Sequence, residues 1–399
     1  MGSYLNPGNF SFRGSLRSKI YVDKSKLIAK TNEVLCTEQK YICVSRPRRF
    51  GKSMAANMLA AYYDRSENTE DLFQNLAISR EKSYEENLNQ YDVIKINMQE
   101  FLSMAGTIEK MLEMLKDYLV VDFEEAYPEV RFRDKNNLIQ TMKDVFSYTK
   151  CPFVILIDEW DCLFREYKQD KEAQKKYLDF LRAWLKDKDY IAMAYMTGIL
   201  PIKKYGSHSA LNMFTEYSMT DPGELAEYFG FTEPEVSAIC EKYGMSFEEA
   251  KTWYDGYQLV AHRQWKDECY SMYNPKSVVE AMLRHKFGTY WNQTETYEAL
   301  KIYIQMDMDG LKASVIRMLT GDSVSINTGT FSNDMTTFAT KDDVLTLLVH
   351  LGYLTYNSID GTVSIPNKEV SQEYINAIST MNWHGVADSV EASRKLLAF

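Results

Sequence analysis

The chain has 399 residues, of which 45% are hydrophobic and 26% charged, and these proportions are typical of a globular protein. This length predicts two or three domains and leaves ample chain to bury a core. The net charge of −10 argues against a general electrostatic attraction to nucleic acid or anionic lipid, so contact with polyanions must come from local basic patches.

The cysteines, histidines and apolar runs argue against several further classes. The six cysteines show no C-x-x-C spacing, which favours a reducing compartment over structural zinc. The five histidines show no spacing typical of metal ligands. No stretch approaches the ~18 apolar residues of a membrane span, and residues 1–13 lack the apolar core of a signal peptide. We therefore expect a cytoplasmic protein without a membrane segment.

The first elements of the chain surround a basic loop. Residues 1–20 are expected to be irregular, and a helix follows at 26–32. A strand at 40–44 and a helix at 53–64 then enclose the loop Ser45-Arg46-Pro47-Arg48-Arg49-Phe50-Gly51-Lys52-Ser53. Strand, turn, Gly-Lys-Ser and helix is the layout of a phosphate-binding loop, in which backbone N–H groups and a helix N-terminus surround a polyphosphate.

One position of this loop departs from the general motif. The motif asks for Gly five residues before Gly51, and that position is Arg46. A basic turn that opens an ordinary amphipathic helix is the alternative interpretation. Arg46, Arg48, Arg49 and Lys52 place four cations within seven residues of an otherwise acidic chain, and this concentration favours an anionic ligand.

The segments up to residue 200 alternate between strand and helix patterns, which predicts a parallel sheet with helices on both faces. In such sheets ligands bind at the carboxyl ends of the strands, and Val44, Ile157 and Met196 each precede polar residues at such an end. The further strands are expected at 92–98, 152–157 and 191–196, and the helices at 107–126, 135–148 and 171–187.

Beyond about residue 215 short helices with clear starts dominate. Thr232 and Glu235 form a capping box, and Asn274-Pro275 opens a helix to about Arg284. A helix at 342–350 followed by a hairpin around Asp360-Gly361 has the outline of a winged helix. The expected short helices span 221–228, 232–243 and 246–253, and the expected domains span 1–215, 216–335 and 336–399.

Asp158-Glu159, directly after a buried strand, supplies what a phosphate-binding loop needs. Asp158 can hold Mg²⁺, and Glu159 can orient the attacking water or accept its proton. Thr197 ends the neighbouring strand and is placed either to contact the γ-phosphate or the attacking water, or to satisfy loop backbone. Asp161 is better explained as a helix start than as a ligand. Arg48 or Arg49 could neutralise transition-state charge, or both could bind an acidic surface.

Several of these motifs together resemble the bacterial AAA-ATPase-like family, whose loop carries Arg at position 46. The resemblance rests on Tyr21-Val22-Asp23-Lys24-Ser25, on Arg46 to Ser53, on Ile157-Asp158-Glu159-Trp160-Asp161, Thr197-Gly198-Ile199, Phe229-Gly230-Phe231-Thr232, Trp253-Tyr254-Asp255-Gly256-Tyr257, Tyr273-Asn274-Pro275 and Ile365-Pro366-Asn367. It implies a P-loop ATPase domain followed by a helical, winged-helix-like region. Many relatives also carry a PD-(D/E)XK nuclease-like domain, which this chain either lacks or ends before.

The ligands that we expect are ATP and Mg²⁺. Catalysis is assigned to Glu159, Lys52, Thr197 and Arg49, and the metal to Ser53 and Asp158. The nucleotide contacts are assigned to Arg46, Pro47, Arg48, Arg49, Phe50, Gly51, Lys52, Ser53 and Met54, and the resemblance adds Tyr21 and Asp23 on the adenine side.

Three functions fit these assignments. The first is an Mg-dependent ATPase that acts as a conformational switch and regulates an attached or partner nuclease-like domain. The second is an ATP-sensing module with little hydrolysis. The third is nucleic-acid binding through the winged helix. Its helix at 341–350 is acidic and apolar, which argues against this function because a groove-reading helix needs Arg, Lys, Asn or Gln. GTP is disfavoured because no Asn-Lys-x-Asp motif follows the last strand, and the adjacent Asp158-Glu159 favours an ATPase over a small-molecule kinase.

Overall fold

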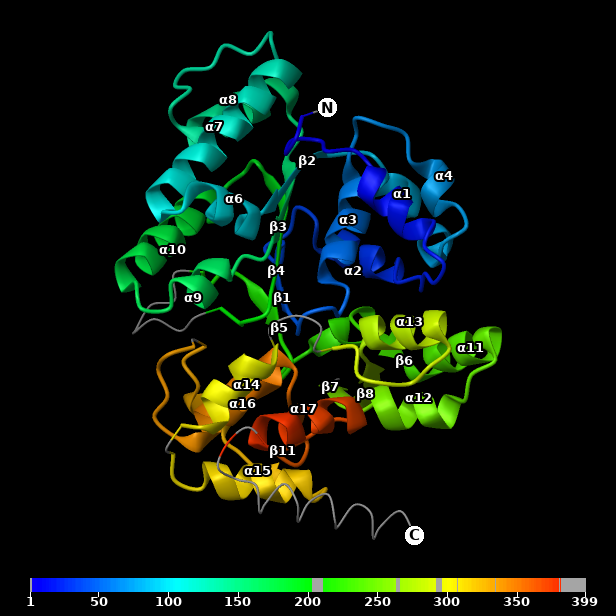
Figure 1. Cartoon of the computed structure of the whole chain (residues 1–399). Helices are drawn as coiled ribbons and strands as arrows, with labels where there is room; N and C mark the ends of the chain where they lie inside the picture. The colour runs from blue at the N-terminus through cyan, green and yellow to red at the C-terminus, as the bar shows by residue number, and fades with distance from the viewer. Residues whose placement is uncertain are drawn as a thin grey trace. The chain divides into compact units, whose positions relative to one another are not determined.

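The computed structural model describes residues 2–202, 211–262, 266–291, 296–306, 308–333, 335–379 and 381. Within it the chain forms two compact units (Figure 1). The first unit comprises Met1–Ser45 and Lys52–Glu216, and the second comprises Arg46–Gly51 and Tyr217–Phe399. Residues 46–51 of the basic loop therefore belong to the second unit, whereas Ser45, Lys52 and Ser53 belong to the first.

The first unit contains a five-stranded sheet in the order β2-β3-β4-β1-β5. Its strands are β1 (Tyr41–Ser45), β2 (Asp92–Asn97), β3 (Phe153–Asp158), β4 (Ile191–Gly198) and β5 (Thr215–Tyr217). The pairs β1–β4, β3–β4 and β2–β3 are parallel. Every residue of β1, β3 and β4 is buried, because helices cover both faces of the sheet (Figure 1). The predicted parallel sheet with helices on both faces is confirmed.

The predicted long helices of the first unit are also confirmed, and several begin at a side-chain cap. Asn97, Thr107, Asn137 and Asp170 each accept a backbone N–H from the first turn of the helix that they precede. The helices are α1 (Phe10–Leu16), α2 (Lys26–Val34), α3 (Lys52–Tyr63), α4 (Glu70–Phe73), the 3₁₀ helix η1 (Ala77–Arg80), α5 (Tyr84–Asn87), α6 (Met98–Ala105), α7 (Ile108–Ala126), α8 (Leu138–Thr149), α9 (Cys162–Glu166) and α10 (Lys171–Leu185).

The expectation that residues 1–20 are irregular is wrong. Helix α1 lies there, and its Phe12 is buried and stacked on the Phe73 ring at 5.1 Å between centroids. Upstream of it, Leu5 forms a bridge with Ile94 of β2. Tertiary packing of a few apolar side chains therefore orders a segment whose composition is typical of a loop.

The second unit is mainly helical, as predicted, but it also contains two three-stranded sheets. The capping box of Thr232 and Glu235 is present, and Asn274 caps the helix that begins at Pro275. The sheet β6-β8-β7 is antiparallel and was not predicted. These elements are η2 (Gly223–Tyr228), β6 (Phe231–Thr232), α11 (Glu233–Tyr243), α12 (Phe247–Tyr254), β7 (Tyr257–Ala261), β8 (Glu268–Tyr273) and α13 (Pro275–Arg284).

The helix and hairpin expected near the end of the chain are confirmed as elements. The hairpin strands pair antiparallel, and β9 adds a third strand through Val363 opposite Val324. The winged-helix assignment stays a prediction, and residues 382–399 of the expected 336–399 element lie outside the described residues. The elements are α14 (Thr296–Ile304), α15 (Leu311–Leu319), β9 (Val324–Ser325), η3 (Thr328–Thr330), α16 (Lys341–Leu351), β10 (Thr355–Asn357), β11 (Thr362–Ser364) and α17 (Lys368–Ser379).

None of the helices in the described part of the chain is long and apolar enough to cross a lipid bilayer.

Candidate functional site

The carboxyl ends of the central strands meet at one edge of the first unit's sheet. β4 lies between β1 and β3, and the register places Val44 opposite Thr197 and Ile157 opposite Met196. Asp158, the last residue of β3, is opposite Asn97 of β2. The strand ends that the sequence predicted to carry the site are therefore neighbours in the sheet.

Lys52 is the first residue of α3 and lies at this edge. Its side chain is buried, and burial lowers the pKa of its ammonium group, whereas the nearby carboxylates of Glu159, Asp158 and Asp161 raise it. Ser53 and Met54, the next two residues, are exposed on the first turn of α3. A buried cation, an exposed hydroxyl and a helix N-terminus thus come together, which is the donor set that a polyphosphate needs.

Gly51 gives the loop the backbone conformation that leads into α3. Its φ is +90°, in the left-handed region that glycine adopts most readily. Arg49, two residues earlier, has a φ of +69°, which is uncommon for a residue with a side chain. The loop therefore contains two left-handed positions within three residues, of which only one is a glycine.

Asp158 is nearly fully buried and is oriented by its neighbours. Its Oδ1 accepts the backbone N–H of Glu159 at 3.1 Å and the hydroxyl of Thr197. Thr197 thus donates to the predicted metal ligand, a role that differs from both roles considered for it from the sequence. The hydroxyl fixes one carboxylate oxygen, which is how a second residue orients a metal ligand.

Glu159 has a left-handed backbone, with φ +54°, and its carboxylate forms an ion pair with Arg165 of α9. Burial raises the pKa of Glu159, while Arg165 and Lys52 lower it. Sequence analysis missed Arg165 altogether. The one signal was its spacing of four residues from Asp161, which fits an ion pair on a helix.

Asp161 is fully buried and connects α9 with the end of β4. Its Oδ2 accepts the backbone N–H groups of Ile199 at 3.0 Å and Leu200 at 2.8 Å, and lies 3.3 Å from Nε of Arg165. The prediction that Asp161 starts a helix is correct in position, but its side chain makes no cap hydrogen bond. A Cβ on Gly198 would lie 2.8 Å from Asp161 Oδ1, so glycine there allows the close approach.

Tyr21 and Asp23 lie among the elements of the first unit. Asp23 accepts the backbone N–H groups of Ser25 at 2.8 Å and Ala77 at 2.7 Å. The Tyr21 ring packs edge-on against Phe12, and burial raises the pKa of its hydroxyl. These contacts hold the segment before α2 against the start of η1. A role of Tyr21 and Asp23 in binding adenine stays a prediction.

The side chains of the basic loop pack within the second unit. Arg46 is fully buried, its Nη1 donates to the carbonyl of Tyr217 at 2.8 Å, and its guanidinium lies 5.5 Å above the Phe229 ring. Pro47 is buried and Arg48 is exposed.

Arg49 and Phe50 continue this packing. Arg49 Nη1 donates to the carbonyls of Tyr290 at 3.0 Å and Trp291 at 2.6 Å. The carbonyl of Phe50 accepts the N–H of Gly230 at 3.1 Å, while its ring packs edge-on against Tyr257. Arg46 and Arg49 therefore have protein partners, and their roles toward phosphate stay predictions.

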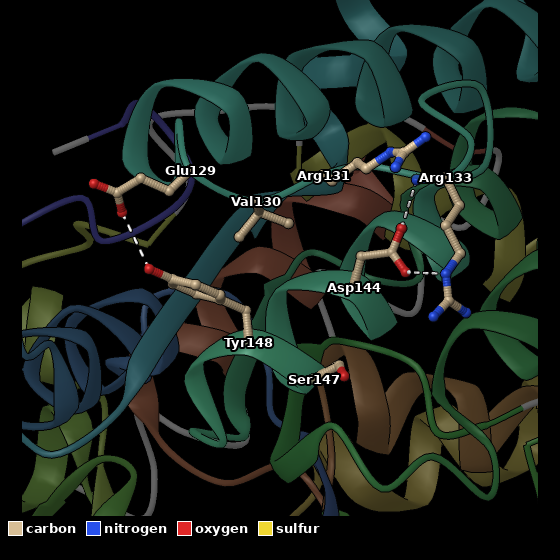
Figure 2. Close-up of a pocket in the computed structure, with 7 residues that line it drawn as sticks. All are labelled: Glu129, Val130, Arg131, Arg133, Asp144, Ser147 and Tyr148. Atoms are coloured by element: carbon tan, nitrogen blue, oxygen red, sulfur yellow. Dashed lines mark hydrogen bonds and ion pairs between the residues drawn. The ribbon is translucent and has the colours of Figure 1, made fainter.

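A separate surface pocket of about 300 Å³ lies in the first unit, beside α8 (Figure 2). Asp144 there accepts the backbone N–H of Arg133 at 2.8 Å, and Tyr148 donates to Glu129 at 3.2 Å. Val130, Arg131 and Ser147 complete its lining, so no predicted site residue belongs to it.

Comparisons with known proteins agree with the motifs. Residues 12–207 match the family model described as predicted AAA-ATPase. A curated relative, an uncharacterised protein in the vnfD 5′ region of Azotobacter chroococcum mcd 1, is 24% identical over 287 residues, covering 69% of this chain. The chain spans about half the length of that relative, 51%.

Two solved structures from Aeropyrum pernix are distantly similar. The ORC2 protein in ADPNP–ADP complexes has a TM-score of 0.37 and 8% identity, with 96% of this chain and 98% of that chain covered. The ORC1 protein in complex with DNA has a TM-score of 0.29 and 12% identity, with 96% and 99% covered. Scores this low carry no argument about this chain.

The family match covers strands β1 to β4, the basic loop and the strand ends described above. Residues 12–207 of this chain thus match the AAA-ATPase-like family of predicted AAA-ATPases.

Proposed function

We propose that this chain binds ATP with Mg²⁺ at the β1–α3 loop and hydrolyses it. The observation that carries the proposal is the buried Lys52 ammonium group beside Asp158 and Glu159 at the carboxyl edge of a parallel sheet. Lysine is almost never fully buried unless it is paired, and groups with a shifted pKa concentrate at functional sites.

The residues present fit both ligands. The exposed hydroxyl of Ser53 and the oriented carboxylate of Asp158 are hard oxygen donors, which Mg²⁺ prefers. Lys52 and the N-terminus of the 12-residue helix α3 supply positive charge for the phosphates. When bound, the metal ion would neutralise charge that develops on the phosphate oxygens.

Each residue then has a distinct task. Lys52 binds the β- and γ-phosphates, and Ser53 and Asp158 hold the metal ion. Thr197 keeps the Asp158 carboxylate in one orientation through its hydroxyl. Glu159 orients the attacking water and accepts its proton, for which the carboxylate must be available to the water rather than fully engaged by Arg165.

That ion pair favours a second candidate function, an ATP-sensing module with slow hydrolysis. A Glu159 carboxylate that stays on Arg165 would leave binding intact and remove most of the catalysis. Control of a nuclease-like domain or another partner, a nucleic-acid role and a cytoplasmic location are proposals that rest on the sequence and its resemblance alone.

Binding is tested with the Mg²⁺ complex of AMP-PNP, a non-hydrolysable ATP analogue, by isothermal titration calorimetry. Lys52→Ala should weaken binding at least ~30-fold, because truncating one partner of a buried charge pair costs about 2 kcal/mol or more. Equal affinities for the wild type and this variant, with both folded by circular dichroism, would refute the proposed site.

Hydrolysis is tested by phosphate release under saturating ATP. Glu159→Gln should reduce kcat by about 10²- to 10⁴-fold, the usual contribution of a general base, with little change in AMP-PNP affinity. Glu166→Gln is the matched control, because Glu166 is exposed and lies seven residues after Glu159 in the sequence. An unchanged turnover in Glu159→Gln would refute the catalytic role of Glu159, whereas tight binding with little phosphate release by the wild type would favour the sensing function.

A further inference from the structure

The segment of residues 46–51, here called the loop segment, is held by the second unit on several sides. Its Arg46, Arg49 and Phe50 each make a hydrogen bond to a residue of that unit, as described above. The partners lie between residues 217 and 291, far along the chain from the loop. The loop segment, which we propose binds phosphate, is thus held by backbone groups of residues 217 to 291 in the second unit.

Glu369, in the first turn of α17, completes the most connected of these contacts. It is fully buried, and its Oε1 accepts the backbone N–H groups of Tyr290 at 2.5 Å and Trp291 at 2.9 Å. The carbonyls of the same two residues accept from Arg49. The backbone of these two residues therefore lies between a buried carboxylate and the loop guanidinium. One peptide unit, formed by the C=O of Tyr290 and the N–H of Trp291, has its N–H toward Glu369 and its C=O toward Arg49.

The charges at the two ends of this arrangement influence each other. Burial raises the pKa of Glu369, and its hydrogen bonds together with the Arg49 charge lower it. Peptide dipoles oriented between a carboxylate and a cation are stabilised by both, so the four residues act as one network. We call the set Glu369, Tyr290, Trp291 and Arg49 the Glu369 relay.

A second contact fixes the same part of the loop segment. Gly352 has a φ of +87°, and a Cβ there would lie 2.8 Å from Pro47 Cβ and 2.6 Å from the Trp291 ring. Pro47 and Trp291 thus pack on the same glycine. Together with the relay, this contact accounts for the persistence of the left-handed backbone at Arg49, since such a conformation lasts only where its surroundings hold it.

We propose that the Glu369 relay couples nucleotide binding at the loop to the conformation of the second unit, with Arg49 as a positioning residue of the loop. This inference rests on the proposed function, because it takes the loop to be the phosphate site. Binding coupled in this way is reciprocal: a change at Glu369 alters nucleotide affinity, and nucleotide alters the protection of residues 290, 291 and 369.

The first test measures AMP-PNP·Mg²⁺ affinity of the full chain by calorimetry. Glu369→Gln keeps the shape of the side chain and removes its charge, and it should weaken binding at least 5-fold, the lower end of typical coupling between sites. Glu373→Gln is the matched control, because Glu373 lies one turn further on α17 and is equally buried. The control should change affinity less than 2-fold.

The second test separates a positioning role of Arg49 from a purely catalytic one. If Arg49 acts through the relay, Arg49→Ala should weaken AMP-PNP binding, and the double variant with Glu369→Gln should be no weaker than the more affected single variant. If Arg49 only neutralises transition-state charge, Arg49→Ala should lower kcat with affinity unchanged, and that result would overturn the inference.

A third readout needs no variant. Saturating AMP-PNP·Mg²⁺ should slow amide hydrogen exchange at Tyr290, Trp291 and Glu369 by at least 3-fold, and Lys52→Ala should abolish this effect. Wild-type binding with unchanged exchange, or equal losses in Glu369→Gln and Glu373→Gln, would refute the relay and leave the proposed site standing. A wild type that does not bind AMP-PNP would refute both.

Discussion

Asp161→Ala should destabilise the first unit more than the loss of any ordinary cap. The substitution removes the acceptor of two buried backbone N–H groups, those of Ile199 and Leu200, and takes one partner from Arg165. An unsatisfied buried donor costs about 1–3 kcal/mol, and a broken buried ion pair about 3–5 kcal/mol including such losses. We therefore expect a loss of about 3–5 kcal/mol, a large part of the stability of a typical domain.

Differential scanning calorimetry measures this effect as a fall in the Tm of the first unit. A loss of this size corresponds to roughly 6–20 °C for a unit of about 200 residues. Asp170→Ala is the control, because the exposed Asp170 only caps α10 by accepting the N–H of Ala173 at 2.9 Å, a contact worth about 1 kcal/mol. A Tm for Asp161→Ala within ~3 °C of that of Asp170→Ala would refute the reasoning.

Three further predictions concern single sites. Gly256→Ala should destabilise the second unit by about 3 kcal/mol or more in urea unfolding, because φ is +105° and the new Cβ would lie 2.0 Å from the Pro366 carbonyl oxygen. The control Gly244→Ala, with φ +64° and open space around the new Cβ, should cost only about 1 kcal/mol, and equal costs for the two variants would contradict this prediction. Burial raises the pKa of Glu369 above 4.5, so the native state binds its proton more tightly; the stability from this group is full below pH 4.5 and is lost as the pH rises through the native pKa. Glu369→Gln should remove that decline from the pH dependence of Tm, and parallel curves would contradict it. Thr197→Val should cost about 1–2 kcal/mol and weaken Mg²⁺-dependent AMP-PNP binding, and an unchanged Mg²⁺ dependence would exclude the orienting role of its hydroxyl.

The sheet of the first unit could be predicted because its strands are simple. Residues 153–157 are apolar throughout and buried on both faces, so neither periodicity nor tertiary context competes with the strand pattern. The site followed from the same logic, since parallel strands bring Asp158 and Thr197 to one edge. Helix α1 could not be predicted because it is stabilised by the packing of Phe12 on Phe73. The two residues are 61 positions apart, and no local sequence pattern connects them.

The hydrogen-bond networks could not be predicted because they depend on backbone conformations that no local pattern encodes. Glu159 pairs with Arg165 from a left-handed backbone position in the turn after β3. Asp161 accepts the backbone N–H of Leu200 and pairs with Arg165 instead of capping α9. Likewise, the five loop residues 46–50 read as phosphate ligands in the sequence. Their packing in the second unit depends on partners such as Trp291 that no spacing rule connects to the loop.

The passage of the chain from the first unit into the second at residues 46–51, and back at Lys52, has a consequence for synthesis on the ribosome. Strand β1 and helix α3 emerge early, but the carbonyls that hold Arg49 are made 241 and 242 residues later. At about 5–20 residues per second this delay is roughly 10–50 s. The last strand of the sheet, β5, ends at Tyr217, still before Tyr290 and Trp291. We therefore expect a nascent chain to complete its sheet before the loop of residues 46–51 takes its final form, so that the proposed nucleotide binding begins only when the second unit has folded.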